Sequence, residues 1–424
     1  MKFLITFIPL LLISLSSFAY QGQELFTKKP KLNSISAKHT FIFWINGDAE
    51  RFRPTTTNYE VSKIDKFDIE QVRKAAINCK CNVVLFYDQR GTDYWYTAQE
   101  AWGSFIEVYQ NGKRVNFEKT VKRKRHKRNI EVTYKNEKEG TAEVNQASTD
   151  FLKDLISYGT ELFPKSSLHL VYRGHSFARA YKFNNEEMVS PFDYSAIETD
   201  YSTDHFIESF DKLNLKKKLG SITFAACTMS YLDLLTDLSL YTNYVIASQI
   251  PILETIDAGF DLSFMNQVVP SDTDFDISKK IHKTLLSRFS KDAPIDNIIR
   301  ETLMTWINTE VFKENYNQIK ELLQEVKNMD SQFKNVVVTV KPSQNYLDRK
   351  KESGTKQKTI DILRTNVNFE SVYRSVDFGA LITSDPTLMS NYKTLIDDIF
   401  KSIELDGYSD FSHKTGINIM IEAR

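Results

Sequence analysis

Five largely apolar runs, each followed by polar or charged residues, most constrain what this chain can fold into. They cover residues 40–45, 82–87, 168–172, 221–226 and 244–248. Runs that are apolar throughout, rather than alternating, are typical of strands buried on both faces of a parallel sheet. Stretches with helical spacing of apolar residues, such as 64–77 and 151–162, lie between them. The pattern predicts an α/β fold with a mostly parallel central sheet and helices on both faces.

The N-terminus has the pattern of a secretory signal peptide. Lys2 precedes an apolar stretch from Phe3 to Leu15, and small residues follow at positions 17 and 19. A membrane anchor is the alternative, but the run is short for a bilayer span. We therefore expect a cleaved signal over residues 1–19, a secreted or periplasmic protein, and no membrane span after cleavage.

The remaining chain divides by pattern into three parts. Residues 20–37 are expected to be a polar linker, and residues 38–270 the α/β domain. Residues 271–424 are expected to form a C-terminal α+β region, because helical stripes and short apolar runs replace the βα rhythm. Within the α/β domain, a β insertion is expected at about residues 102–135, where Asn111-Gly112 predicts a type I′ hairpin turn.

Three cysteines are too few for a disulfide scaffold in an exported chain of 424 residues. Cys79 and Cys81 are one residue apart, which is a poor geometry for an internal bridge. An odd cysteine in a secreted protein suggests a free and reactive thiol, and Cys227 fits that description.

Cys227 and His175 each follow one of the predicted strands. Neighbouring parallel strands bring such residues to one edge of the sheet, where ligands bind in open α/β folds. A thiol beside an imidazole is a candidate nucleophile and base. Backbone N–H groups of Cys227 and Ser176 are candidates for an oxyanion hole. Because unpaired cysteines are often simply buried, the pattern alone leaves a packing role open.

A resemblance bears on this choice. Residues 224–229, Phe-Ala-Ala-Cys-Thr-Met, resemble the Phe-Asp-Ala-Cys-Leu-Met signature of the clostripain family of cysteine peptidases. Residues 40–48, 82–88, 244–248 and 416–420 are similar to further strands of that family. The resemblance implies a caspase-haemoglobinase-like sandwich and an endopeptidase that acts through an acyl-enzyme. It also implies Cys227 as nucleophile, His175 as its partner, and protein or peptide substrates. No cofactor is required, and calcium enters by family resemblance only.

The chain departs from the family pattern at several positions. Ala225 replaces an aspartate that helps bind a basic P1 side chain, and Ser176 replaces a glycine after the histidine. Gln249 stands where the family often has glutamate, and Asp257 is a candidate second acidic pocket residue. An inactive, peptidase-like binding protein is therefore the main alternative, and a generic exported α/β hydrolase is the third. Selection of basic P1 residues and the oligomeric state stay open.

Charge and motifs exclude other classes. Fifty-five basic and 55 acidic residues balance, so no nucleic-acid partner is expected. The run 122–128, Lys-Arg-Lys-Arg-His-Lys-Arg, is expected to be a solvated loop, with an anionic-surface patch or a processing site as alternatives. Asp48 and Asp88 end strands but lack a histidine at motif spacing, so no metal site is predicted. The absence of a phosphate-binding glycine loop disfavours a nucleotide enzyme.

Overall fold

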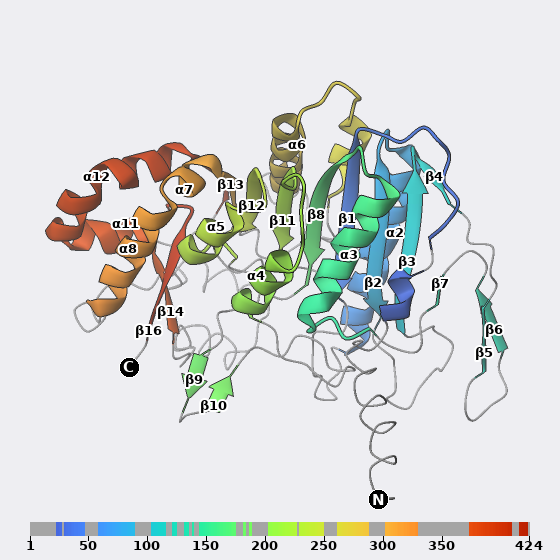
Figure 1. Cartoon of the computed structure of the whole chain (residues 1–424), viewed down its shortest axis with the longest axis horizontal. Coiled ribbons are helices and arrows are strands. Elements are labelled where there is room, and N and C mark those ends of the chain that lie inside the picture. The colour runs from blue at the N-terminus through green and yellow to red at the C-terminus, as the bar shows by residue number, and fades with distance from the viewer. Residues whose placement is uncertain are drawn as a thin grey trace, which may run out of the picture.

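A mixed sheet with helices on both faces forms the centre of the computed structural model (Figure 1). The structure describes residues 23–27, 29–46, 58–89, 103–115, 121–124, 131–134, 138–139, 144–174, 181–183, 186–188, 202–226, 229–249, 261–287, 302–329, 373–408 and 415–422. Every statement below concerns these residues.

Five parallel strands occupy the middle of the sheet. Their spatial order is β12 (Tyr244–Ser248), β11 (Ser221–Ala225), β8 (Ser167–Arg173), β1 (His39–Asn46) and β2 (Asn82–Gln89). Antiparallel strands extend it on both sides: β13 (Thr302–Asn308) and β15 (Ile403–Tyr408) next to β12, and β3 (Gly103–Gln110) and β4 (Lys113–Arg114) next to β2. With β7 (Lys138–Glu139), which pairs with β3, the described sheet has ten strands. The predicted sheet is confirmed.

The central strands are buried on both faces, as their continuous apolar character predicts. All eight residues of β1 are buried, and they alternate between two cores. Ile42 and Trp44 pack into one core, while Phe41 and Phe43 pack into the other. Successive strand side chains point to opposite faces, so a strand covered on both sides needs apolar residues at every position.

Different helices cover the two faces. α3 (Thr149–Leu162), α4 (Thr203–Asp211) and α5 (Leu232–Leu238) contribute to one core and lie in front of the sheet in Figure 1. α2 (Asn58–Asn78), η2 (Ser263–Gln267) and α6 (Asp274–Ser287) contribute to the other. Ser148 accepts a hydrogen bond from the N–H of Asp150 and so caps α3, as its sequence predicts.

The segment expected as a linker packs onto the sheet instead. η1 (Gln23–Phe26) places Leu25 and Phe26 in the first core, where both are buried. The Phe26 ring lies 5.9 Å from that of Phe151 and 6.3 Å from that of Phe86. Two apolar side chains in a polar segment are enough to anchor it, because each gains free energy by leaving water.

The segment expected as a β insertion forms strands where it is described, and β3 and β4 extend the central sheet. Asn111 and Gly112 have φ values of 50° and 76° and join β3 to β4, as the type I′ prediction requires. Gly112 is also needed for space, because a Cβ there would lie 2.8 Å from the backbone oxygen of Ile77. The expectation of a loop at the basic run 122–128 is wrong for its first part. Residues 122–124 lie in β5 (Val121–Lys124), which pairs with β6 (Glu131–Tyr134). Strand pairing uses backbone groups, so a run of basic side chains does not prevent it.

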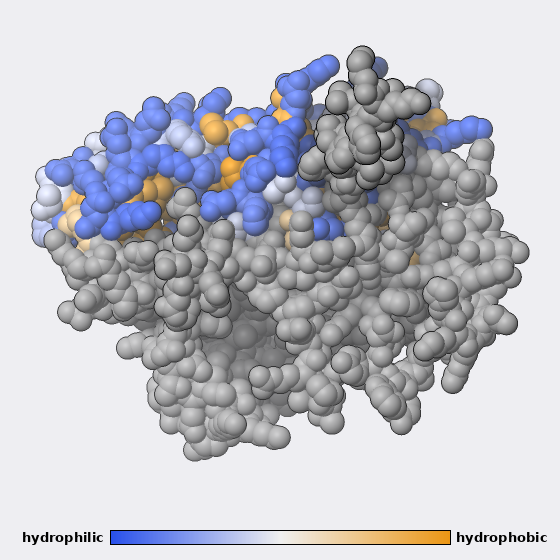
Figure 2. All heavy atoms as spheres, turned by 60° about the horizontal axis from the view of Figure 1, so that its bottom comes forward, coloured by the Kyte–Doolittle hydropathy of each residue, from blue (hydrophilic) through white to orange (hydrophobic). Residues whose placement is uncertain are grey.

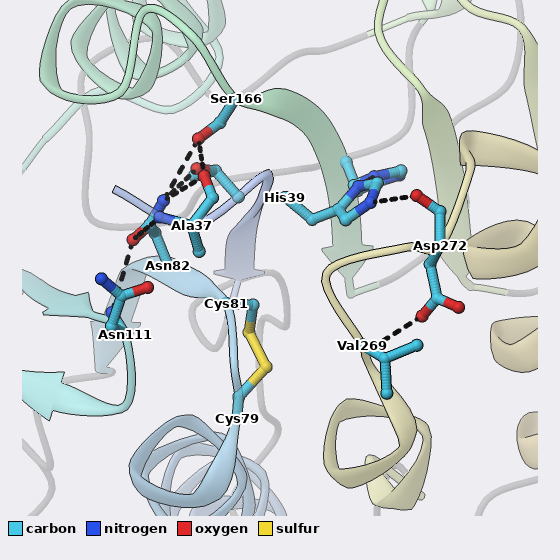
Figure 3. The surroundings of a disulfide bond; sticks show 11 residues. Ala37, His39, Cys79, Cys81, Asn82, Asn111, Ser166, Val269 and Asp272 are labelled. Atoms are coloured by element: carbon cyan, nitrogen blue, oxygen red, sulfur yellow. Dashed lines mark hydrogen bonds between the residues drawn. A yellow bond between two sulfur atoms is a disulfide. The ribbon is translucent and has the colours of Figure 1, made fainter. Parts of the chain in front are cut away.

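Cys79 and Cys81 correct a second expectation, because they form a disulfide (Figure 3). Two residues of extended chain span about 7 Å, which is too far for a bridge. Here the chain turns between α2 and β2, and the two Cα atoms are 5.1 Å apart. Since both cysteines of this pair are taken, Cys227 has no cysteine left in the chain to pair with.

The sheet continues beyond residue 270, where the α/β domain was expected to end. β13 and β15 belong to the C-terminal part and form one side of the sheet. Near them lie α7 (Glu310–Glu314), α8 (Tyr316–Asn328), α11 (Phe378–Ser384) and α12 (Pro386–Lys401), which pack on the first core. Asp385 caps α12 by accepting hydrogen bonds from the N–H groups of Thr387 and Leu388, and β15 begins two residues after α12 ends. The domain boundary itself stays a prediction.

Three small pairings complete the described elements: β5 with β6, β9 (Tyr181–Phe183) with β10 (Glu186–Met188), and β14 (Tyr373–Asp377) with β16 (Asn418–Glu422). In the view of Figure 2 the coloured surface is mostly hydrophilic, with small apolar spots. No helix among the described residues is both long and apolar enough to cross a bilayer. The expected signal peptide lies outside the described residues.

Candidate active site

The two strands that precede His175 and Cys227 are direct neighbours. β8 and β11 run parallel, and their register pairs Ser221 with His169 and Ala225 with Arg173. Paired residues in these strands are therefore 52 positions apart in the sequence. His175 and Cys227 are also 52 positions apart. Each comes two residues after the last described pair, at the carboxyl edge of the sheet.

The candidate site residues themselves lie outside the described residues. This holds for Cys227, His175, Ser176 and Asp257. Gly174, before His175, and Ala226, before Cys227, are described, and the residues around them show how this end of β8 and β11 is built. The predicted adjacency of the two strands is confirmed, whereas the dyad, the oxyanion groups and the pocket residue stay predictions.

Gly174, the residue before His175, sits in a tight space at the end of β8. A Cβ atom at this position would lie 2.5 Å from the Tyr172 hydroxyl and 3.2 Å from the Asn46 Cβ. Contacts this short are not tolerated, so only glycine fits without a shift of the strand end. The neighbouring Arg173 donates from Nε to Oδ2 of Asp68 at 2.8 Å, which ties this strand end to α2.

The described residues after Cys227 are held by two other segments. The N–H groups of Met229 and Ser230 both donate to the Ser248 carbonyl oxygen, at 2.9 and 3.1 Å. Ser230 also contacts the C-terminal segment: its carbonyl accepts from the Asn418 N–H at 2.7 Å, and its hydroxyl donates to the Gly416 oxygen at 2.5 Å. The loop that follows the candidate nucleophile is therefore fixed by β12 and β16.

Gln249 connects those two segments. Its side chain is fully buried, donates from Nε2 to the Ile417 oxygen at 3.1 Å, and accepts from the Gly416 N–H at 2.9 Å. The Asn418 side chain in turn donates to the Gln249 carbonyl at 2.6 Å. A glutamate would lack the N–H donor, so glutamine suits these contacts. Sequence reasoning noted Gln249 as a departure but missed this role, because nothing local links positions 249 and 416–418.

Ala225 faces a cation rather than an acid. Residues paired in register on parallel strands point to the same face of the sheet. Ala225 therefore shares a face with Arg173, whose charge is paired with buried Asp68. Where the family signature carries an aspartate, the described residues here offer a methyl group beside a neutralised guanidinium.

Comparison with known proteins decides the family. The model of the clostripain family matches residues 57–423, which is most of the chain. The chain belongs to the clostripain family. The match spans both strands of the candidate site and the C-terminal segment that contacts them, which confirms the resemblance found in the sequence.

Solved structures of this family share the fold. A secreted C11 cysteine protease from Bacteroides thetaiotaomicron, in complex with an irreversible peptide inhibitor, aligns with a TM-score of 0.51 and 12% identity, covering 92% of this chain and 93% of that one. An inactive zymogen C11 protease from Parabacteroides distasonis gives 0.50 and 12%, covering 92% and 93%. Among curated proteins, the sequence search found no match. The caspase-like α/β fold is thereby confirmed, and the clostripain-family chain is placed among cysteine peptidases.

Proposed function

We propose that this protein is a secreted cysteine endopeptidase with Cys227 as nucleophile and His175 as its proton-transfer partner. The observation that carries the proposal is a shared spacing. Residues paired between β8 and β11 are 52 positions apart in the sequence, and His175 and Cys227 are separated by the same number of positions. If the register continues for two residues, the thiol and the imidazole follow adjacent strand ends. Secretion is supported by the signal-like N-terminus and by the family neighbour described as secreted.

The chemistry follows from these roles. The Cys227 thiolate attacks the scissile carbonyl carbon, and the backbone N–H groups of Cys227 and Ser176 stabilise the resulting oxyanion. His175 gives a proton to the leaving amine, which departs and leaves a thioester on Cys227. His175 then takes a proton from water, whose oxygen attacks the thioester. The acid product leaves, which restores the Cys227 thiolate and the protonated His175 of the starting state.

Selection of a basic P1 side chain would depend on Asp257. Ala225 supplies no carboxylate, and the charge of Arg173 beside it is already paired with Asp68. We expect cleavage after Arg or Lys only if Asp257 lines the pocket. Without it, Ala225 offers no charge to hold a basic side chain, and uncharged P1 residues would be favoured.

The direct test is a fluorogenic peptide library with randomised P1, applied to the reduced full chain, Cys227→Ala, His175→Ala and Asp257→Asn. Turnover that disappears in Cys227→Ala and His175→Ala supports the dyad. Residual turnover in Cys227→Ala equal to that of the parent would refute it. A P1 profile unchanged in Asp257→Asn would remove Asp257 from the pocket.

The second candidate is an inactive family member that binds peptides. Ala225 and Ser176 favour it, because both replace residues that serve catalysis or substrate binding in the family pattern. Peptide binding without turnover, at equal affinity in the parent chain and in Cys227→Ala, would support this alternative.

A further inference from the structure

A buried cluster of two histidines and an aspartate lies at the amino edge of the sheet. His39 is the first residue of β1, His169 the third residue of β8, and Asp274 the first residue of α6. Both histidines are buried, with 1% and 0% of their surfaces exposed, while the Asp274 side chain is 18% exposed. The cluster therefore joins three elements and reaches solvent through its carboxylate.

Three ligand-type atoms converge on one point. His39 Nδ1 and His169 Nε2 are 3.0 Å apart, and Asp274 Oδ1 lies 3.9 Å from the first and 3.8 Å from the second. A point equidistant from these three atoms is about 2.1 Å from each, which is the bond length of zinc to imidazole nitrogen and carboxylate oxygen. If the carboxylate oxygen moved slightly closer to the two nitrogens, an ion at this bond length would lie outside the plane of the three atoms. That position leaves room for a fourth ligand.

The outer hydrogen bonds orient both rings for this role. His39 Nε2 lies 2.9 Å from the Asp272 carbonyl oxygen, which only accepts, so the proton of neutral His39 sits on Nε2 and Nδ1 carries a lone pair (Figure 3). His169 Nδ1 lies 2.9 Å from the Ser221 hydroxyl, which can donate or accept. If His169 donates from Nδ1 to Ser221, its Nε2 is free to bind a metal. Such second partners are typical of metal-binding histidines.

A neighbour outside the cluster holds the Asp274 carboxylate in place. The Asn243 side chain steadies the second carboxylate oxygen at 3.3 Å.

Gly220 makes the close approach of the ligands feasible. A Cβ at this position would lie 2.5 Å from the His169 Cε1 and 2.8 Å from the Asp274 Oδ1. Any side chain here would push the carboxylate away from the ring. The backbone next to β11 is therefore shaped around the cluster.

We propose that His39, His169 and Asp274 bind one divalent transition-metal ion, with zinc as the best match. Two imidazoles and one carboxylate suit zinc, whereas calcium and magnesium prefer all-oxygen sites. Water from the exposed side of Asp274 would complete the coordination. The prediction of no metal site considered only Asp48 and Asp88, so this proposal departs from it.

The site would serve stability rather than peptide hydrolysis. His169 and Arg173 are separated by about 13 Å along β8, at 3.3 Å per residue, so the cluster lies at the opposite edge from the candidate dyad. An ion bound there would cross-link β1, β8 and α6. The proposal is thus independent of the proposed peptidase activity.

The test uses the full chain carrying Cys227→Ala, so that a thiolate at the other edge cannot bind the metal. After chelator treatment, calorimetric titration with zinc chloride should give one equivalent per chain, and zinc should raise the Tm. The cobalt-loaded chain should show the strong visible absorption of tetrahedral coordination. Absence of saturable zinc binding would mean a hydrogen-bonded histidine pair only and would overturn the proposal. Tighter binding of calcium than of zinc would overturn it as well.

Variants locate the site. Asp274→Asn should weaken zinc binding at least about tenfold, and Ser221→Ala about 10- to 100-fold through loss of the second partner. His169→Gln should abolish it. Asp276→Asn, on the exposed side of the same helix turn, and His282→Gln, at another buried histidine, are matched controls that should bind like the parent.

If His169→Gln fails to fold, Asp274→Asn decides, because it keeps the shape of a partly exposed side chain. Parent-like zinc affinity in Asp274→Asn would refute the site.

Discussion

Gln249 accepts a hydrogen bond from the Gly416 N–H at 2.9 Å and so joins the end of β12 to a segment 167 residues further along the chain. The same side chain donates to the Ile417 oxygen, and both contacts are buried. Next to them, Ser230 binds Gly416 and Asn418. The surroundings of the candidate nucleophile are therefore completed by the C-terminal part of the family fold.

Replacing Gln249 should destabilise the protein. Gln249→Leu would leave the Gly416 N–H and the Ile417 oxygen buried without these partners, at a cost of about 1–3 kcal/mol for such groups. Urea unfolding measures the difference. Gln324→Leu, an exposed glutamine on α8, is the control and should stay within about 0.5 kcal/mol of the parent. A Gln249→Leu midpoint equal to that of the control would show that the contacts contribute nothing.

Gly174→Ala should impair turnover if His175 acts in catalysis. The added Cβ would press on the Tyr172 hydroxyl and displace the strand end next to His175. Misplacement of a catalytic group by 1 Å can cost about 100-fold in rate. The kcat/KM of Gly174→Ala measures this effect, and adding Tyr172→Phe should restore part of the loss. No recovery in the double variant would contradict a steric cause.

The pairing of Glu404 with Lys279 should appear in the pH dependence of stability. The hydrogen bond from Lys279 lowers the pKa of Glu404 below its usual 4.5. A carboxyl group whose pKa is lower in the folded state than in the unfolded state stabilises the fold at pH values above its unfolded-state pKa. This stabilisation is lost as the pH falls through the folded-state pKa. Glu404 is half exposed, so the effect should be small.

Glu404→Gln is the variant that tests this pairing. Its urea midpoint should fall less than that of the parent as the pH drops below about 4.5. Glu314→Gln, on the exposed side of α7, should follow the parent. Parallel curves for the parent and Glu404→Gln would rule the pairing out as a source of pH dependence.

One thiol should react in the native chain. The Cys79–Cys81 disulfide is buried and takes two of the three cysteines. A thiol reagent applied without reductant should therefore count one equivalent in the parent and none in Cys227→Ala. After denaturation and reduction the parent should give three. Three thiols in the unreduced, denatured parent would show that the disulfide does not form.

The basic run at 122–128 gives a prediction on maturation. If it is a processing site, incubation of the purified chain should produce two fragments with a new N-terminus inside this run, detectable by mass spectrometry. Cys227→Ala should stay intact if the cleavage is the protein's own. A cleavage site elsewhere, or fragments in both chains, would argue for a purely structural role of the β5–β6 pair.

The central strands could be predicted because burial on both faces leaves a continuous apolar run in the sequence. β15 could not, since its residues, Ile-Glu-Leu-Asp-Gly-Tyr, include two acids and a glycine, which are depleted in strands. Its strand conformation comes from pairing with β13, a tertiary effect that outweighs local preference. Ile403 also lies four residues after Ile399 of α12, so the local spacing of apolar residues favours a helix at this position.

For the candidate site, the adjacency of its two strands was predictable from the sequence, and the roles of its residues stay predictions. Cys227 and His175 stand out because each follows an apolar run, and the adjacency of those runs is confirmed. The amino-edge cluster gave no such signal. His39 and His169 are 130 residues apart and lie inside apolar strands, where a histidine carries no motif. Only the register of β1 and β8 brings them together.

The contacts of Ser230 also bear on the order of events during synthesis. Its partner Gly416 is made 186 residues later, so the loop after Cys227 lacks its final supports while most of the chain already exists. Contacts between such distant residues form late because closing a long loop costs entropy. For the proposed peptidase, this means that the nascent chain lacks the supports of its candidate active site until residues 416–418 have been made.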